Sequence, residues 1–120
     1  MAGAIRFHES EVDWVGDLGE GVMARSGGRS RRKVIGDPAE GLFVNLSEYD
    51  PDITLEAHSH DQPELMYILE GEMTIGGERC RPGTVLRVPA NTVYGPLTAG
   101  PEGVRFLVIR SGPARTTVAE

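Results

Sequence analysis

Two histidines and a glutamate form a group in this chain that could carry out chemistry. His58 and His60 lie two residues apart, and Glu64 follows after the short segment 61–63. Side chains two residues apart on an extended strand point to the same face, so the two imidazoles should project side by side. Segment 61–63 contains a proline and is turn-like, so Glu64 can return towards the same point on the neighbouring strand. Two neutral imidazoles and one carboxylate make a three-ligand site for a divalent metal ion, with positions left open for other ligands.

The ligand types predict a divalent metal ion as the cofactor but leave its identity open. Iron(II) is the first choice, because two histidines and one carboxylate form the facial triad of non-haem iron oxygenases. Manganese, nickel, copper or zinc would also accept these donors.

Short strands separated by turns must position these three side chains. Apolar residues alternate with more polar ones over 42–46, as in a half-buried strand. Further extended segments are predicted at 53–60, 64–69, 72–75, 84–88 and 104–110, with turns at Glu70-Gly71 and Gly76-Gly77. No amphipathic helix or internal repeat is evident. Many short strands with closely spaced turns indicate an all-β sandwich or barrel.

The segment around the histidines resembles the first signature motif of the cupin superfamily. Its spacing is H-x-H-x3-E-x6-G, from His58 to Gly71. Asp52 stands where the family usually has a glycine, six residues before the first histidine. The resemblance covers residues 40–112 and implies a single-domain, metal-binding monocupin with a cupin-like double-stranded β-helix, or jelly-roll barrel. It also implies that the two histidines and the glutamate hold the metal.

A partial match to the second cupin motif follows. Gly83, Pro89, Asn91 and Tyr94 reproduce its spacing. Asn91 replaces the family's usual glycine after the proline, and Tyr94 replaces its usual histidine. The resemblance therefore implies that one of four expected metal ligands has been exchanged for a phenol.

Tyr94 leaves three roles open. A phenol has a pKa near 10 in water and is a poorer ligand than imidazole at neutral pH. Its hydroxyl can ligate the metal, can hydrogen-bond a water or substrate at the metal, or can only fill space beside the three other donors. We expect the second role, with the phenol as a proton donor or orienter, and take Tyr94 as the candidate catalytic residue.

The implied function is that of a metal-dependent enzyme acting on a small organic molecule, with a dioxygenase-type oxidoreductase as the first choice. A metal-dependent isomerase or lyase would use the same Lewis acid. A non-catalytic small-molecule-binding or sensor cupin is the other alternative, although nothing resembles a DNA-binding helix-turn-helix. Strand parity assigns the apolar wall of the substrate pocket to Met66, Ile68, Leu86 and Val88.

Composition and charge bear on the partners. Hydrophobic residues make up 39% and charged residues 25% of the chain, as in an ordinary globular domain with one core. The net charge is −6, yet Arg25 to Lys33 form a basic, Gly/Ser-rich run. We interpret this run as a solvated loop, and leave open a role in admitting an acidic substrate. Without a wide basic face and aromatic platforms, no nucleic-acid partner is expected.

The sequence predicts neither a membrane protein nor a secreted one. No long apolar run is present, and the N-terminal residues lack the apolar centre of a signal peptide. Cys80 is the only cysteine, which makes an intrachain disulfide impossible. The expected location is cytoplasmic.

Three segments are expected along the chain. Residues 1–22 form an arm that packs on the barrel or on a partner subunit, residues 23–112 form the barrel, and residues 113–120 form a flexible tail. The strands predicted at 64–69 and 104–110 are apolar on both faces, which requires a second covering layer. The arm or a second copy of the chain would supply that layer, and we predict a homodimer.

Overall fold

The computed structural model describes residues 3–15 and 30–119 of the chain. The strands are β1 (Ser30–Val34), β2 (Phe43–Tyr49), β3 (Thr54–Leu55), β4 (His58–His60), β5 (Glu64–Ile75), β6 (Glu78–Cys80), β7 (Val85–Val88), β8 (Leu97–Arg110) and β9 (Thr116–Val118), and two short 3-10 helices span Glu9–Glu11 and Pro38–Glu40. No helix in these ranges has the length and apolar character needed to cross a membrane. The all-β class predicted from the sequence is confirmed.

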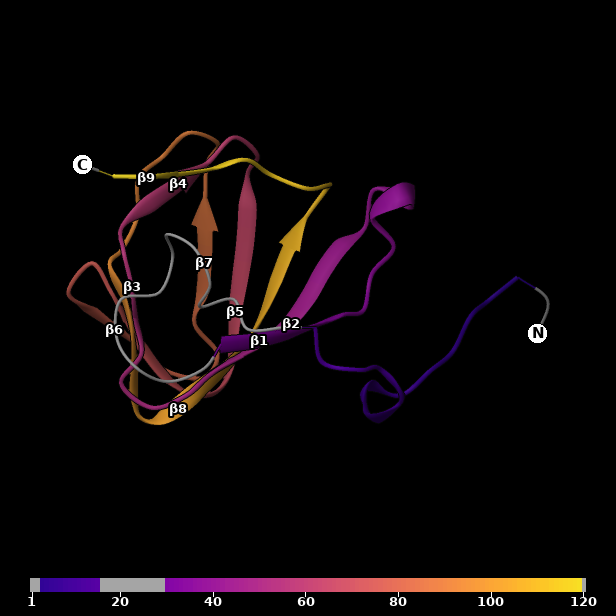
Figure 1. Ribbon diagram of the computed structural model, residues 1–120, viewed down its shortest axis with the longest axis horizontal. Helices are drawn as coiled ribbons and strands as arrows, with labels where there is room; N and C mark the ends of the chain where they lie inside the picture. The colour runs from indigo at the N-terminus through magenta and orange to yellow at the C-terminus, as the bar shows by residue number, and fades with distance from the viewer. Residues whose placement is uncertain (1–2, 16–29, 120) are drawn as a thin grey trace.

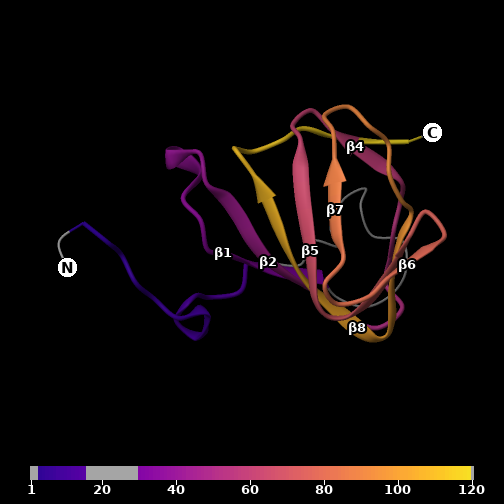
Figure 2. The same cartoon turned by 180° about the vertical axis from the view of Figure 1, so that it is seen from behind.

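The strand pairs are antiparallel, and the long strands β5 and β8 form the centre of the main sheet. This sheet has the order β1-β2-β8-β5-β6, with β3 also paired to β8 and β7 also paired to β5. A second sheet pairs β4 with β9. The main sheet bends around the core, and the β4–β9 pair lies at the end away from the bend of β8 (Figures 1 and 2). This arrangement is the predicted jelly-roll barrel.

Strand β5 is continuous where the sequence predicted two strands separated by a turn. The β5–β8 ladder shifts register at two places next to Gly71. Gly71 has a φ of +70°, and a Cβ there would lie 2.1 Å from the carbonyl oxygen of Gly103 on β8. The irregularity is therefore a bulge that bends the strand without ending it.

Asp52 and Asn91 keep a backbone conformation that glycine adopts easily. Their φ angles are +64° and +60°, and they are the non-glycine residues with positive φ in the described part of the chain. Asp and Asn tolerate this left-handed region better than other side chains do. The two departures from the glycines of the cupin motifs therefore alter side chains without requiring a different chain path.

The hydrophobic core lies inside the barrel and is built mainly from residues of β5 and β8. Phe106, Met66 and Leu97 are each at most 2% exposed. The ring of Tyr49 packs edge-on against Phe106, with 5.0 Å between the ring centroids. Burial of a large apolar side chain contributes about 1.5–3 kcal/mol to folding, so this cluster stabilises the frame around the cavity described below.

Strand β1 lies within the basic run that we interpreted as a solvated loop. Ser30–Val34 pairs along its whole length with β2. Arg31 is exposed, whereas Arg32 lines the inside of the barrel. For these residues the loop interpretation was wrong, because hydrogen bonds to a distant strand override weak local propensity. Residues 25–29 of the run lie outside the described residues.

The C-terminal segment also differs from the expected flexible tail. Within residues 113–120, β9 pairs with β4. Just before β9, the backbone N–H of Arg115 donates to Asp61 Oδ1 at 2.7 Å. Backbone pairing with a site-bearing strand gives this segment a position that its small polar residues do not predict.

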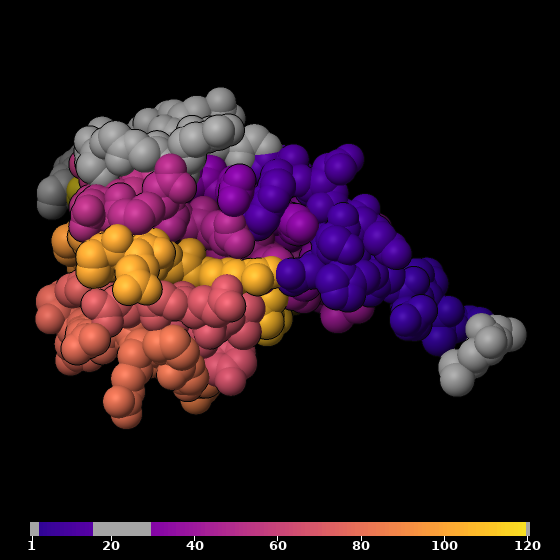
Figure 3. Space-filling model, turned by 90° about the horizontal axis from the view of Figure 1, so that it is seen from below, coloured from indigo at the N-terminus to yellow at the C-terminus, as the bar shows by residue number. Residues whose placement is uncertain are grey.

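The N-terminal arm contacts the outer face of β1 and β8. The ring of Trp14 lies 4.3 Å from the guanidinium carbon of Arg31 and 4.7 Å from Lys33 Nζ. Glu9 forms an ion pair with Arg105, and its carbonyl accepts a hydrogen bond from Lys33 Nζ at 2.8 Å. Beyond these contacts the arm projects from the barrel (Figure 3).

An outer face of the barrel remains apolar and exposed. Tyr67, Leu69, Val85 and Ile109, on β5, β7 and β8, are 36–55% exposed. Tyr67 lies directly opposite Val85 in the β5–β7 ladder. These four side chains therefore still require the second covering layer that the sequence predicts.

Candidate active site

Two backbone ladders hold the histidines in place. On one side β4 pairs with β9, and on the other His58 pairs with Tyr94. The His58 N–H donates to the Tyr94 carbonyl at 3.0 Å, and the Tyr94 N–H donates to the His58 carbonyl at 2.9 Å. His58 and His60 are 2% and 8% exposed, and their ring centroids are 4.9 Å apart. The two rings lie side by side, as the two-residue spacing predicts.

Glu64 reaches the same place from the first position of β5. Its Oε1 lies 3.7 Å from His60 Nε2. Arg110, at the end of β8, places its Nε 3.1 Å from the same oxygen, and its guanidinium carbon lies 4.4 Å from the centre of the Phe43 ring. A buried carboxylate without a partner would be costly, so the Arg110 cation compensates Glu64.

The Tyr94 hydroxyl lies among these three side chains. Its oxygen is 2.8 Å from Glu64 Oε2, 3.1 Å from His58 Nε2 and 3.3 Å from His60 Nε2. Residues from β4, from β5 and from the loop before β8 therefore meet within hydrogen-bond distance of one oxygen atom.

The available protons do not satisfy every lone pair in this cluster. His58 Nδ1 lies 2.7 Å from the Glu56 carbonyl, which can only accept, so Nδ1 carries the proton and Nε2 presents a lone pair. The single hydroxyl proton of Tyr94 is donated to Glu64. His58 Nε2 and the Tyr94 oxygen thus face each other without a proton between them. His60 Nδ1 has its own partner, the Thr116 hydroxyl, at 3.0 Å.

Burial keeps the two imidazoles and the phenol in their uncharged forms, whereas Tyr94 and Arg110 partly offset its effect on Glu64. Desolvation lowers the pKa of His58, and it lowers the pKa of His60 to about 4. Desolvation also raises the pKa of Glu64, and it raises that of Tyr94 together with the neighbouring Glu64 charge. At neutral pH the imidazoles are therefore neutral and the phenol is protonated. Neutral imidazole is the form that binds a metal.

The donor chemistry fits a divalent cation, although the site is not a ready-made cage. Among residues 3–15 and 30–119, no group of three or more His, Cys, Asp or Glu side chains is arranged to hold a metal ion. The Tyr94 hydroxyl stands between the donors. Neighbouring ligands of one ion are about 3 Å apart when each is about 2.1 Å from the metal. The three donors surround the phenol oxygen at 2.8–3.3 Å, and a cation would also give the His58 lone pair a partner.

The cluster lines a cavity of about 210 Å³ inside the barrel. The apolar wall consists of Leu55, Met66, Leu97, Phe106 and Val108, and the remaining lining residues are Arg32, Asn45, Ser47, Tyr49, His58, His60, Glu64, Tyr94, Arg110 and Thr116. Reactive and apolar groups therefore share one cavity.

The four residues assigned to the pocket wall lie at different places in the structure. Met66 lines the cavity that also holds the histidines. Ile68 is buried in the hydrophobic core, and Leu86 packs against that core. Val88 lines a different hollow, beside Pro63. Parity identifies the side chains that face inward, but depth along the barrel decides which of them reach the cavity.

Several lining residues were not predicted from the sequence. Arg110 shares its strand parity with Val108 and Phe106, so a charge at the end of an apolar strand was an available signal. No comparable local signal marks Asn45 or Thr116. Their positions depend on pairing with β8 and β4, respectively.

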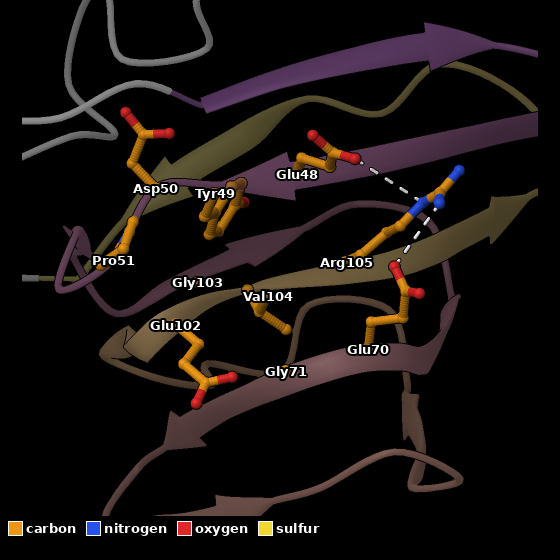
Figure 4. A pocket seen from close by; sticks show the side chains of 10 residues that line it. All are labelled: Glu48, Tyr49, Asp50, Pro51, Glu70, Gly71, Glu102, Gly103, Val104 and Arg105. Carbon is orange, nitrogen blue, oxygen red and sulfur yellow. Dashed lines mark hydrogen bonds and ion pairs between the residues drawn. The ribbon is translucent and has the colours of Figure 1, made fainter. Parts of the chain in front are cut away.

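A second hollow of about 250 Å³ lies where β2, β5 and β8 meet their neighbouring turns (Figure 4). Arg105 is the cation among its lining residues, and it already pairs with Glu48 and Glu70. Glu102 also lines this hollow. The acidic hollow lacks the convergent donors of the interior cavity, so we place the candidate active site inside the barrel.

A family model described as the cupin domain matches residues 45–110. The match contains the two histidines, Glu64, Tyr94 and Arg110. No curated protein matches the sequence.

Solved structures with a similar fold come from several organisms. The polyketide cyclase RemF from Streptomyces resistomycificus is 20% identical, with a TM-score of 0.80 over 98% of this chain and 86% of that one. An acetylacetone dioxygenase from Acinetobacter johnsonii is 13% identical, with a TM-score of 0.68 over 95% and 76%. A sugar phosphate isomerase of the cupin superfamily from Silicibacter pomeroyi is 17% identical, with a TM-score of 0.73 over 97% and 82%. At these identities the similarity shows the fold alone.

Proposed function

Because the chain belongs to the cupin family, we propose that it is a metal-dependent enzyme acting on a small organic molecule, with dioxygenase-type oxidation as the first choice of reaction. One observation carries the proposal. Two imidazole nitrogens and a carboxylate oxygen lie within 2.8–3.3 Å of the Tyr94 oxygen, in the cavity inside the barrel. Such a cluster of Lewis bases beside an apolar wall suits a metal cofactor and an organic substrate.

His58, His60 and Glu64 would hold the metal. The hydrogen bond from His58 Nδ1 to the Glu56 carbonyl orients the ring and directs Nε2 inward, as second-shell partners of metal ligands do. Thr116 has the same orienting role for His60. When bound, a divalent cation supplies Lewis-acid polarisation and, if it is iron, the capacity for oxidation by molecular oxygen.

Tyr94 would serve as a proton donor or orienter, and Arg110 would stabilise the Glu64 carboxylate. Tyr94 holds its proton at the phenol oxygen on a 2.8 Å hydrogen bond to Glu64, a position from which it can donate to or orient a substrate oxygen. Arg110 limits the cost of the buried Glu64 charge. Phe106 and Leu55 would hold the carbon skeleton and exclude water from the reacting end.

An isomerase or lyase is the second candidate reaction class. The same donors would polarise a carbonyl, and the protonated Tyr94 would serve proton transfer without any oxidation. Among the proteins of similar fold are an acetylacetone dioxygenase, a polyketide cyclase and a sugar phosphate isomerase, so both classes occur on this fold. A binding protein without turnover would use the same cavity.

Metal content and oxygen uptake test the proposal. Elemental analysis of the purified protein should find one divalent metal ion per chain, and iron together with substrate-dependent oxygen uptake would support the oxygenase. His58→Ala should lose the metal, whereas His8→Ala, which removes an exposed histidine of the arm, should retain it. Equal metal content in the His58→Ala variant would refute the ligand assignment. Metal without oxygen uptake would favour the isomerase or lyase.

A further inference from the structure

The inner face of β2 is polar where the opposite wall of the cavity is apolar. Asn45 and Ser47 are each 2% exposed, and both line the same cavity as the histidines. Ser47 lies opposite Arg32 on β1 and opposite Phe106 on β8 in the strand registers. Directly opposed residues of antiparallel strands share a face, so Arg32, Ser47 and Asn45 form a continuous polar strip inside the barrel.

Two atoms of this strip are buried without a hydrogen-bond partner. They are Arg32 Nε and Asn45 Oδ1. Their state contrasts with that of Arg31, the next residue along β1, whose guanidinium pairs with Glu48 on the outside at 2.8 Å. Buried polar groups are nearly always hydrogen-bonded, because burial without a partner forfeits the bonds that water would make. Both residues line the same cavity, which points to a ligand there that supplies the missing partners.

The charges around the cavity favour an anion. The cavity is lined by two guanidinium groups, from Arg32 and Arg110, and by one carboxyl group, from Glu64. Glu64 is already paired with Arg110, whereas no ion pair of Arg32 is found within the described residues. One positive charge is thus left over on the polar strip, and a guanidinium is well suited to a carboxylate because of its planar fork of donors.

We propose that Arg32 and Asn45 form a recognition subsite for a small hydroxycarboxylate. The carboxylate accepts hydrogen bonds from Arg32, and a hydroxyl on the same molecule donates to Asn45 Oδ1. The carbon skeleton packs on Phe106, and the other end of the molecule faces the histidines and Tyr94. At about 210 Å³ the cavity is below the roughly 300 Å³ lower limit usual for drug-sized ligands, so the ligand is small. The subsite names the substrate class of the enzyme proposed above and rests on that proposal.

A matched panel of ligands tests the subsite. The probes are 2-hydroxybutanoate and mandelate, each with its methyl ester and with its deoxy acid, butanoate or phenylacetate. Binding is measured by titration calorimetry on the purified, metal-containing protein. We expect each hydroxy acid to bind at least about 10-fold more tightly than its ester, since the ester loses the charge. We expect a similar preference over the deoxy acid, which leaves Asn45 without a donor.

Variants attribute each preference to one residue. Arg32→Gln should bring the preference for acid over ester down by at least about 10-fold, whereas Arg31→Gln, on the outer face of the same strand, should leave it unchanged. Asn45→Leu should abolish the preference for hydroxy acid over deoxy acid and keep that for acid over ester. Arg32→Lys keeps the charge and should retain part of the acid preference, so it serves if the glutamine variant does not fold.

Several results would overturn the subsite. They are equal binding of acids and esters, binding of no member of the panel, or an Arg32→Gln variant with the wild-type preference. Metal analysis of the same samples separates this inference from the proposed function. A protein that holds no metal yet shows an Arg32-dependent acid preference would retain the subsite and lose the metal-dependent enzyme. A protein that holds metal but shows no acid preference would retain the metal-dependent enzyme and lose the subsite.

Discussion

Replacement of Tyr94 by phenylalanine removes one oxygen from the centre of the candidate site and leaves the ring in place. The lost hydroxyl donates at 2.8 Å to Glu64, a carboxyl that is 6% exposed. In the metal-free protein, the variant therefore leaves a buried acceptor with one partner fewer. Arg110 still lies 3.1 Å from the other oxygen of the carboxyl, so the charge keeps its compensation.

The expected loss of stability follows from these contacts. A hydrogen bond to a charged group contributes about 1.5–3 kcal/mol. The variant also removes the unfavourable contact between the phenol oxygen and the His58 lone pair, so we expect a net cost of about 1–2 kcal/mol. Unfolding entropy of about 2.1 cal/mol/K per residue gives about 250 cal/mol/K for 120 residues, and the cost then corresponds to a fall in Tm of about 4–8 °C.

The assay is thermal unfolding of both proteins after treatment with a chelator, with Tyr67→Phe as the matched control. Tyr67 is 40% exposed on the outer face of β5, so loss of its hydroxyl should change the Tm very little. With metal present, Tyr94→Phe should keep the metal and lose roughly 100-fold or more in turnover, as for a lost proton donor. An unchanged Tm of the metal-free variant would refute the hydrogen-bond argument. Loss of the metal would instead make the phenol a ligand.

Three further predictions concern pH, backbone and assembly. Metal-free protein should lose stability as the pH falls from 6.5 to about 4, because burial lowers the pKa of His60 to about 4 and the unfolded chain takes up that proton first. The raised pKa of Glu64 has the opposite effect on stability as the pH falls. Denaturant titrations of wild type and His60→Gln at several pH values therefore isolate the contribution of the imidazole. Identical pH profiles of the unfolding free energy in the two proteins would contradict the prediction. Gly71→Ala should lower the free energy of urea unfolding by more than about 3 kcal/mol, since the new Cβ would meet the backbone of β8. Gly77→Ala, with open space at φ +88°, should lower it by only about 1 kcal/mol. Similar losses in the two variants would refute the steric argument. Light scattering should give twice the 13.0 kDa of one chain, and Val85→Glu on the exposed apolar face should give a monomer; a monomeric wild type at micromolar concentration would remove the dimer.

Local sequence signals predicted much of the frame. The Gly76-Gly77 hairpin between β5 and β6 is present, and both glycines have positive φ. The extended segments over 64–69, 84–88 and 104–110 coincide with parts of β5, β7 and β8. Turn chemistry and alternation act over a few residues, so these features can be recognised without knowledge of the fold.

The features that escaped prediction depend on partners distant in the sequence. Ser30–Val34 is mostly polar and Thr116–Val118 spans only three residues, so neither is recognisable as a strand from its own sequence, and each forms a strand by pairing with β2 or β4. Arg32 faces inward and Arg31 faces outward, although both belong to the same basic run. A strand's register decides which of two neighbours enters the cavity, and the register is set by the partner strand.

The amino-acid sequence by itself determined the all-β class and the types and spacing of the donors at His58, His60, Glu64 and Tyr94, because strand periodicity and side-chain chemistry are local properties. Only the tertiary structure decided that the Tyr94 oxygen stands between the other three donors, that Arg110 compensates Glu64, and that Arg32 and Asn45 face the same cavity. Those relations join residues from strands far apart in the chain, and they exist only once antiparallel pairing and the bend of β5 and β8 bring the strands around one cavity.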